Sequence, residues 1–578
     1  MAGIFFFIYC FGFQFPFHGT PFDAQRHGNP PLTPAWALEC WLWEDDVNSA
    51  QRVDTLLEGY AKYDIPVRTI LLDSPWSMRY NDFQVDTLRY PHPKEWFGEL
   101  QDKGYRVVLW MTSLIDSKSK DTRVKDSGDW FRDAKEKGYL AGKGGQINWW
   151  KGKGGFIDYT NPKAVKWWHG LQQTMFDYGI DGWKLDMTCT LFWTQIGRVP
   201  FLYKTTHKGV MTTRGYMDHY YREEYQHGLT QNPEFVTLAR AIDRGFHPEG
   251  YAPIDAAPVT WVGDQKHTWQ SAGKPFKEDT LHTDIASDGE GGIEMALQNI
   301  LASATVGYNI IGSDVAGYSG NTIPPRLYMR WVELSAFCGL FLNGGHGERA
   351  LWDRSPQELE IIRKYSWLHT ELIPYIYSYV VTGHEGGTIL QRPVNGKYHY
   401  LFGDDFFVAP IYRDQLSNEV KLPKGNWRYF FNDKELIKGP VSFKRDFPLD
   451  EYPVYIREGS IVPMNIERRY TGLGSEANKG CLTWLIYPGV DNQFTVYHPD
   501  KRGSSTVIMV NRPETIEITL KDTKKPSILN IHLDKKPGKV SFDGVELSDL
   551  LDYNFDVQKS RLIVRFPDIE DGVLTIVK

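Results

Sequence analysis

Four aspartates stand where apolar runs of the sequence end, and a carboxylate in that position can do chemistry. Asp73 follows "VRTILL", Asp186 follows "GWKL", Asp264 follows "VTWVG" and Asp314 follows "NIIGS". Any one of them could simply cap the next helix, which is an ordinary structural role. Four together, with Arg240 ending another apolar run, favour a catalytic site, because the carboxyl ends of the strands in a barrel meet on one face.

A pair of such carboxylates is suited to glycoside hydrolysis. One attacks the anomeric carbon, while the other protonates the leaving oxygen and later deprotonates water; a separation of roughly 5–5.5 Å favours retention of configuration. The two environments must differ, so that one group stays ionised and the other holds a proton. Lys184 lies two residues before Asp186, on the same strand face, and its charge would keep that carboxylate ionised. We therefore expect Asp186 to be the nucleophile.

The composition agrees with a carbohydrate-active protein and argues against several other classes. The chain of 578 residues holds 20 Trp, 32 Tyr and 31 Phe, and aromatic faces pack against the C–H faces of sugars as well as in ordinary cores. A net charge of −7 without a basic patch disfavours nucleic-acid binding. Five scattered cysteines without a CxxC pair predict neither a disulfide framework nor a zinc site.

The first residues, "MAGIFFFIYCFGFQFPF", are apolar but lack the basic start of a signal peptide and are broken by Pro16. The segment is also too short and too interrupted to span a bilayer. We interpret residues 1–33 as strand-like, the remnant of an N-terminal β region. The sequence leaves the compartment open.

Between residues 34 and 382, apolar runs alternate with segments of helical periodicity, which predicts a (β/α)8 barrel, with a doubly wound sheet as the competing α/β fold. The eight expected strands lie within 36–43, 67–73, 106–112, 179–187, 235–241, 257–264, 306–315 and 337–343. Long insertions follow the third, fourth and sixth. Residues 383–467 and 468–578 alternate short β-rich runs with turn clusters, which predicts two C-terminal all-β sandwich domains.

From about residue 30 to 467 the sequence resembles glycoside hydrolase family 31, whose members are retaining α-glycosidases. The resemblance rests on ordered motifs: "PPLTPAWALECW", "YDIPVRTILLD", "GFIDYTNP", "GWKLDMT", "TLARA", "WVGDQKHTW", "IIGSDVAGY" and "YIREGSIVPM". It implies that Asp186 is the catalytic nucleophile and Asp264 the general acid/base. It also implies that Asp73 binds hydroxyls of the terminal sugar, whereas Asp314 is expected to be structural.

The remaining site residues are expected to hold the sugar. The resemblance places His346 and Arg240 in the pocket and puts Trp150 along its wall, although "INWW" does not fix whether Trp149 or Trp150 faces the sugar. The full set of predicted substrate-binding residues is Asp73, Trp76, Trp150, Lys184, Arg240, Trp261 and His346.

Two departures from the family pattern affect the expected substrate. Only about thirty residues precede the expected barrel, so we expect the family's N-terminal β-sandwich, which in many members contributes a loop to the pocket, to be largely missing from this sequence. Lys184 and "LLDSPWS" differ from the α-glucosidase pattern, and they lead us to favour an α-galactoside over an α-glucoside.

We therefore expect a retaining exo-α-glycosidase that needs no metal or organic cofactor. Its partner would be an oligosaccharide or glycoside, with neither nucleic acid nor membrane involved; the sequence leaves the oligomeric state open. The alternatives are an α-glucosidase or α-xylosidase, a transglycosylase using the same site, and a non-catalytic glycan-binding protein.

Overall fold

The computed structural model describes residues 28–186, 194–196, 199–201, 203–242, 252–270, 291–320, 322–500, 503–567 and 569–578. Most of the N-terminal segment that we interpret as strand-like lies outside these residues. The chain divides into two compact units, Met1–Leu327 with Leu340–Ser355, and Tyr328–Gly339 with Pro356–Lys578. The division into four domains made from the sequence stays a prediction.

The first unit is built on eight parallel strands, joined in the order β14-β13-β12-β7-β3-β2-β1-β15. The strands are β1 (Trp41–Leu42), β2 (Thr69–Leu72), β3 (Arg106–Met111), β7 (Gly182–Leu185), β12 (Val236–Arg240), β13 (Val259–Trp261), β14 (Ile311–Gly312) and β15 (Leu342–Asn343). The two outer strands meet through a parallel bridge between Asp314 and Leu342, where the Val315 N–H donates to the Leu342 carbonyl at 2.9 Å. The sheet is thus a nearly closed barrel, which confirms the prediction and excludes the doubly wound sheet.

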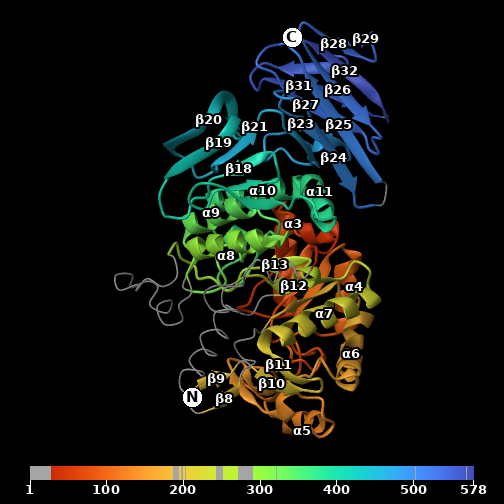
Figure 1. Cartoon of the computed structure of the whole chain (residues 1–578), viewed down its shortest axis with the longest axis vertical. Helices are drawn as coiled ribbons and strands as arrows, with labels where there is room; N and C mark the ends of the chain where they lie inside the picture. The colour runs from red at the N-terminus through yellow and green to blue at the C-terminus, as the bar shows by residue number, and fades with distance from the viewer. Residues whose placement is uncertain are drawn as a thin grey trace. The chain divides into compact units, whose positions relative to one another are not determined.

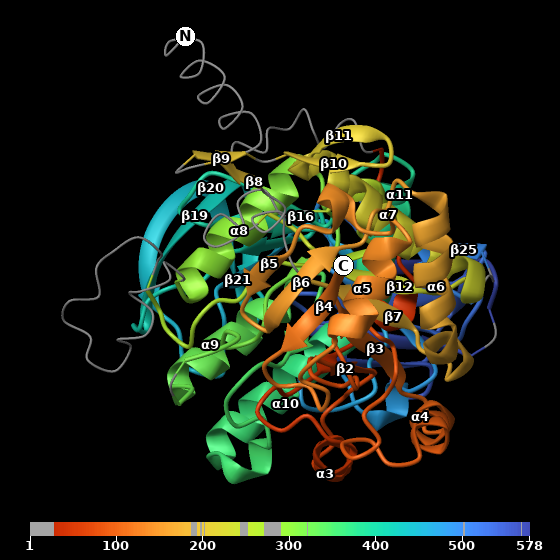
Figure 2. The same ribbon diagram turned by 90° about the horizontal axis from the view of Figure 1, so that it is seen from below.

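Helices follow most of the barrel strands, as Figure 2 shows for β2, β3 and β7 with α4 and α6. They are α3 (Ala50–Lys62), α4 (Pro93–Asp102), α6 (Pro162–Asp177), α7 (Thr213–Gln231), α8 (Ile293–Val306) and α9 (Pro325–Ser335), the last of which runs into the second unit. The starts of two are capped: the Ser49 side chain accepts from the Arg52 N–H, and Asn161 accepts from the Lys163 N–H. Within the described ranges, none of the helices combines the length and apolarity needed to cross a bilayer.

Short strands fill two of the long insertions. After β3, a sheet of β4 (Leu114–Ser119), β6 (Gly152–Phe156) and β5 (Ile147–Trp149) accompanies α5 (Gly128–Glu136). After β7, β8 (Thr194–Ile196) pairs with β9 (Val199–Phe201), and β10 (Tyr203–Thr206) with β11 (Gly209–Thr212). The 3-10 helices are η1 (Ala35–Leu38), η2 (Ala141–Gly144), η4 (Ile254–Ala256), η6 (Leu351–Asp353) and, in the second unit, η7 (Glu476–Asn478).

The second unit contains α10 (Pro356–Glu371), α11 (Ile373–His384) and three sheets, which confirms the all-β prediction for the C-terminal region. The first sheet has the order β16-β17-β18-β21-β19-β20, and its pairs are antiparallel. Its strands are β16 (Gln391–Pro393), β17 (Tyr400–Phe402), β18 (Phe406–Val408), β19 (Ser417–Tyr429), β20 (Asn432–Asp446) and β21 (Val454–Arg457). These strands form one sheet, and the next strand, β22 (Ile461–Met464), pairs with β23 of the following sheet.

The last two sheets, blue in Figure 1, form a sandwich. One has the order β22-β23-β27-β31-β30 and the other β24-β25-β26-β32-β28-β29. Their strands are β23 (Leu482–Ile486), β24 (Asn492–His498), β25 (Gly503–Asn511), β26 (Thr515–Lys521), β27 (Ser527–His532), β28 (Lys539–Phe542), β29 (Val545–Glu546), β30 (Tyr553–Asp556), β31 (Arg561–Phe566) and β32 (Gly572–Val577). Buried side chains of both sheets, among them Trp484 and Ile518, make one apolar core, as period-two alternation predicts.

Candidate active site

One guanidinium holds the two predicted catalytic carboxylates together. Arg240 is buried at the end of β12, and its Nη2 donates to Asp186 Oδ1 at 2.7 Å and to Asp264 Oδ2 at 3.3 Å. These two oxygens can lie no further apart than the two distances added together, which is compatible with the roughly 5–5.5 Å carboxyl separation of retaining glycosidases. The spacing therefore fits double displacement.

Asp186 directly follows β7 and is held in a fixed, ionised state. Its second oxygen, Oδ2, accepts a hydrogen bond from Trp110 Nε1 at 2.9 Å, so both oxygens have a donor. Burial alone would raise the pKa of this carboxyl, but the charges of Arg240 and Lys184, with the hydrogen bonds from Arg240 and Trp110, hold the pKa well below its ordinary value. An oriented, ionised carboxylate has the properties that a nucleophile needs.

Asp264 occupies a more open position beyond the end of β13. Its side chain is 29% exposed, against 13% for Asp186, although both contact Arg240. A more accessible carboxyl can reach a leaving group and water, which an acid/base must do. The two carboxylates therefore share one cation but differ in their access to solvent.

A second cation, Lys184, belongs to the site, and its ammonium group is paired within the protein. Its Nζ donates to Asp73 Oδ2 at 2.7 Å and lies 4.1 Å from the ring centroid of Trp43 and 5.3 Å from that of Trp261. Burial alone would lower the pKa of Lys184, but Asp73 and further carboxylates outweigh it and raise the pKa above its ordinary value. Lys184 is therefore positively charged, and its charge reaches Asp186.

Two of the predicted sugar-binding residues, Asp73 and Trp261, make contacts within the protein. Asp73 Oδ1 accepts the Ser74 N–H at 2.7 Å while Oδ2 accepts from Lys184. Trp261 is completely buried, and the Arg240 guanidinium carbon lies 4.4 Å from its ring centroid. The geometry gives Trp261 contacts with both cations, and the predicted sugar contacts of these two residues stay predictions.

Trp110, Trp149 and Trp150 pack against one another near Asp186, and the two tryptophans of "INWW" differ in burial; which of the two faces the sugar stays a prediction. Trp149 is buried, stacks parallel on Trp110 with centroids 6.4 Å apart, and donates to Asp116 Oδ1 at 2.9 Å. Trp150 is 42% exposed and meets Trp149 edge-on. Trp76 is buried and donates to the Trp110 carbonyl at 2.7 Å. Trp149, rather than Trp150, thus supports the residue that contacts Asp186.

His346 lies in a loop that joins the ends of three strands, together with two acids that the sequence reasoning did not single out. Its Nε2 is 3.2 Å from Asp45 Oδ2 and its Nδ1 2.7 Å from Asp46 Oδ1, while the Tyr318 hydroxyl donates to Asp45 at 2.8 Å. Burial and the charge of Asp73 raise the pKa of Asp45 to about 6. The available signal was "WEDD", acids directly after the first expected strand.

Glycines allow this loop to approach β1. A Cβ atom on Gly344 would lie 1.6 Å from Cδ1 of Trp43, and Gly345 has a φ of +119°. Neither position accepts a larger residue without movement, so the Gly-Gly pair fixes the path that leads to His346.

Asp314 follows β14 and is an unusual buried acid. Its side chain is fully buried, and within the described ranges neither carboxyl oxygen has a hydrogen-bond partner. Burial raises its pKa to about 8 although Lys184 opposes this, so the group holds a proton at neutral pH. Among these same residues, no cluster of three or more His, Cys, Asp or Glu side chains could bind a metal ion.

The fold and the site together define the class of this protein. It is an α/β-barrel protein in which two carboxylates contact one guanidinium. The family model described as the glycosyl hydrolases family 31 TIM-barrel domain matches residues 30–278 and 283–379, and the family's C-terminal domain matches residues 391–462. The chain belongs to glycoside hydrolase family 31.

Known proteins that resemble the chain include several curated enzymes. It is 24% identical to an alpha-xylosidase of Emericella nidulans over 76% of this chain and 54% of that protein. It is 25% identical to alpha-glucosidase 2 of Bacillus thermoamyloliquefaciens, over 94% and 71%, and 23% identical to an isomaltosyltransferase of Sporosarcina globispora, over 80% and 44%. The chain therefore spans between 44% and 71% of the length of these relatives.

The fold also matches solved structures. A dextranase of Flavobacterium johnsoniae, solved in complex with isomaltotriose, superposes with a TM-score of 0.80 at 22% identity, over 95% of this chain and 72% of that one.

Proposed function

We propose that the protein is a retaining exo-α-glycosidase with Asp186 as the nucleophile and Asp264 as the general acid/base. The observation that carries the proposal is the single guanidinium of Arg240 within 2.7 Å of Asp186 and 3.3 Å of Asp264. An intact carboxylate pair at this spacing argues against a non-catalytic glycan-binding protein.

In the first step, a carboxylate oxygen of Asp186 forms a bond to the anomeric carbon as the bond to the leaving oxygen breaks. Protonated Asp264 gives its proton to that oxygen, so the leaving group departs as a neutral alcohol. Trp110 and Arg240 orient the attacking carboxylate by one hydrogen bond to each of its oxygens. The product of this step is a β-linked glycosyl ester on Asp186.

In the second step, Asp264, now a carboxylate, takes a proton from water while the water oxygen attacks the anomeric carbon. The ester bond breaks and Asp186 leaves as a carboxylate. Arg240 and Lys184 stabilise the returning negative charge, as they do in the resting site. Two inversions give a product with the α configuration of the substrate.

For the sugar, we propose an α-glucoside or α-xyloside. The α-galactoside that the sequence favoured gains no support, because the relatives named above are an alpha-xylosidase, an alpha-glucosidase, an isomaltosyltransferase and a dextranase. Lys184, which prompted that choice, is occupied by Asp73 in the structure.

Transfer to a second sugar is a further candidate activity. The isomaltosyltransferase relative supports it, and the same glycosyl ester would serve both outcomes. Product analysis at rising acceptor concentration distinguishes the two, since transfer gives a longer saccharide in place of the free sugar.

The test uses 4-nitrophenyl α-glucoside, α-xyloside and α-galactoside, with the first anomer released followed by proton NMR. We expect the α-anomer from the glucoside or xyloside. Asp186→Ala should lose turnover and regain 4-nitrophenol release with azide, giving a β-glycosyl azide, while the exposed Asp129→Ala should behave as wild type. Release of the β-anomer first, or full activity in Asp186→Ala, would overturn the proposal.

A further inference from the structure

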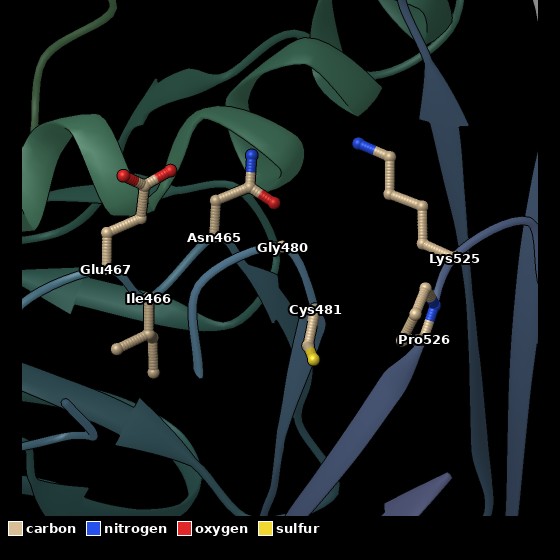
Figure 3. A pocket seen from close by; sticks show the side chains of 7 residues that line it. All are labelled: Asn465, Ile466, Glu467, Gly480, Cys481, Lys525 and Pro526. Atoms are coloured by element: carbon tan, nitrogen blue, oxygen red, sulfur yellow. The ribbon is translucent and has the colours of Figure 1, made fainter. Parts of the chain in front are cut away.

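A polar cavity of about 270 Å³ lies at one end of the β22-β23-β27-β31-β30 sheet, within the second unit (Figure 3). Three segments that flank neighbouring strands form it: one follows β22, one precedes β23 and one precedes β27. β23 runs antiparallel to β22 and parallel to β27. The C-terminal end of β22 and the N-terminal ends of β23 and β27 therefore lie at the same end of the sheet. The lining residues are Asn465, Ile466, Glu467, Gly480, Cys481, Lys525 and Pro526.

Three polar side chains around this cavity make few hydrogen bonds or ion pairs within the protein. Figure 3 shows Glu467 and Lys525 on opposite sides, with Asn465 between them. Within the described part of the chain, neither the side-chain amide of Asn465 nor the ammonium group of Lys525 makes an internal hydrogen bond or ion pair. Glu467 has one loose ion pair, at 3.8 Å between its Oε2 and Arg468 Nη1. An ammonium, an amide and a carboxylate are thus available to a ligand.

The segment that carries Asn465 and Glu467 is held in place before any ligand arrives. Glu371, at the end of α10, accepts the backbone N–H groups of Glu467 at 3.1 Å and Arg468 at 3.2 Å, and also the Thr471 hydroxyl at 3.0 Å. The Asn465 N–H donates to the Glu371 carbonyl at 2.8 Å. A fixed backbone reduces the ordering cost of binding, which is a feature of a preformed site.

We propose that this cavity is a second, non-catalytic saccharide-binding site that takes one pyranose unit. Neighbouring sugar hydroxyls both donate and accept, so they can use the Lys525 ammonium as donor, the Glu467 carboxylate as acceptor and the Asn465 amide as either. The opposite charges leave the lining without net charge, which suits a neutral ligand. The site goes beyond the proposed glycosidase function, because it would bind without cleaving.

Charged ligands suit the cavity less well. An anion would meet Glu467, and a cation would meet Lys525, each at a desolvation cost. A zwitterion such as glycine would match both charges, but its ammonium would compete with Arg468 for Glu467. A hydroxyl donates to that carboxylate without displacing the arginine.

Cys481 offers a local readout, because it lines the cavity and is partly exposed, whereas Cys40 and Cys338 are buried. The experiment measures iodoacetamide alkylation of the Cys481 peptide by mass spectrometry in Asp186→Ala protein, so that the outcome is independent of turnover. We expect methyl α-glucoside at ten times its dissociation constant to slow alkylation about tenfold, because only the free fraction reacts. Glycine and inorganic phosphate should leave the rate unchanged.

Two variants and a matched control decide whether the protection arises in this cavity. Lys525→Met and Asn465→Ala remove side chains without internal partners, so both should fold, and each should raise the dissociation constant about tenfold, so that the same glucoside concentration slows alkylation only about twofold. Lys521→Met removes an exposed lysine of β26 outside the lining and should keep full protection. The proposal is overturned if the glucoside gives no protection, if glycine or phosphate alone protects, or if protection survives in both variants.

Discussion

The Nζ atom of Lys184 lies 2.7 Å from Oδ2 of Asp73, and the two side chains are only 4% and 7% exposed. They come from β7 and from the end of β2, two strands that β3 separates, and Lys184 also lies over the rings of Trp43 and Trp261. A buried ion pair costs desolvation energy when it forms, but the removal of one partner leaves the other as an unpaired buried charge. Removal of Lys184 should therefore change both the stability of the barrel and the charge beside the nucleophile.

We expect Lys184→Met to lower the free energy of unfolding by about 3–5 kcal/mol, because Asp73 is then buried without its cation. The loss of the positive charge also raises the pKa of Asp186, since Lys184 contributes to lowering it. The nucleophile must be ionised, so the acidic limb of the kcat/KM profile should move to higher pH. Urea unfolding and a pH–rate profile measure the two effects.

The double variant Lys184→Met/Asp73→Asn separates stability from catalysis. Neutralising both partners should recover most of the lost stability, while the acidic limb stays displaced because the charge near Asp186 is still missing. If the limb returns to its wild-type position together with the stability, Lys184 does not act on Asp186 through its charge.

Trp110→Phe removes the indole N–H that donates to Asp186 and keeps an aromatic ring against Trp149. We expect kcat/KM to fall about tenfold or more, as for the loss of a hydrogen bond to a charged group, and the pKa of Asp186 to rise. Trp96→Phe is the matched control, because Trp96 makes the same kind of bond, at 3.0 Å to Asp54, between α4 and α3. Equal activity losses in the two variants would contradict the role of the Trp110 bond.

His346→Ala tests whether the loop after β15 shapes the site. The variant loses the contacts to Asp45 and Asp46, so the ends of β1 and β15 are no longer joined by this side chain. We expect kcat/KM to fall on the order of tenfold through misplaced substrate contacts. The free energy of unfolding should change by less than about 1 kcal/mol, because His346 is 34% exposed. A large loss of stability with unchanged kcat/KM would show that the loop is structural only.

The barrel could be predicted from the sequence because its strands are apolar runs of sufficient length. Each of the eight expected runs contains one observed strand, but β1, β14 and β15 are only two residues long. Their ends depend on pairing with neighbouring strands, and a one-dimensional pattern holds no information on that pairing. The strand β22 lies within residues 383–467 but pairs with β23 of the following sheet, and the sequence pattern does not contain that pairing.

The sequence pointed to Asp186 and Asp264 because each lies close behind an apolar run: Asp186 directly follows β7, and Asp264 lies three residues beyond β13. Asp45 and Asp46 escaped notice because "WEDD" has the composition of an ordinary loop; they reach His346 only because closure of the barrel makes β1 and β15 neighbours. The sequence could not show whether Trp149 or Trp150 points inward. β5 is only three residues long, and the alternation of side chains along a strand tells which face is buried only when the face of a neighbouring residue is known.

Asp314→Asn tests the buried acid at the end of β14. The wild-type carboxyl has a pKa of about 8 in the folded protein and an ordinary value of 3.8. Between these pH values the folded state keeps a proton that the unfolded chain releases. This group therefore contributes stability at low pH that is lost as the pH rises through about 8.

Asparagine has the same shape and does not titrate. The stability of the Asp314→Asn variant relative to wild type should therefore increase by roughly 1 kcal/mol for each pH unit between pH 5 and pH 7. Urea titrations at pH 5, 6 and 7 measure this difference. An ionised Asp314 paired with Lys184 would give a different result: the variant would be less stable than wild type, and the gap would stay constant between pH 5 and pH 7, because the folded and unfolded carboxyl would both be ionised there.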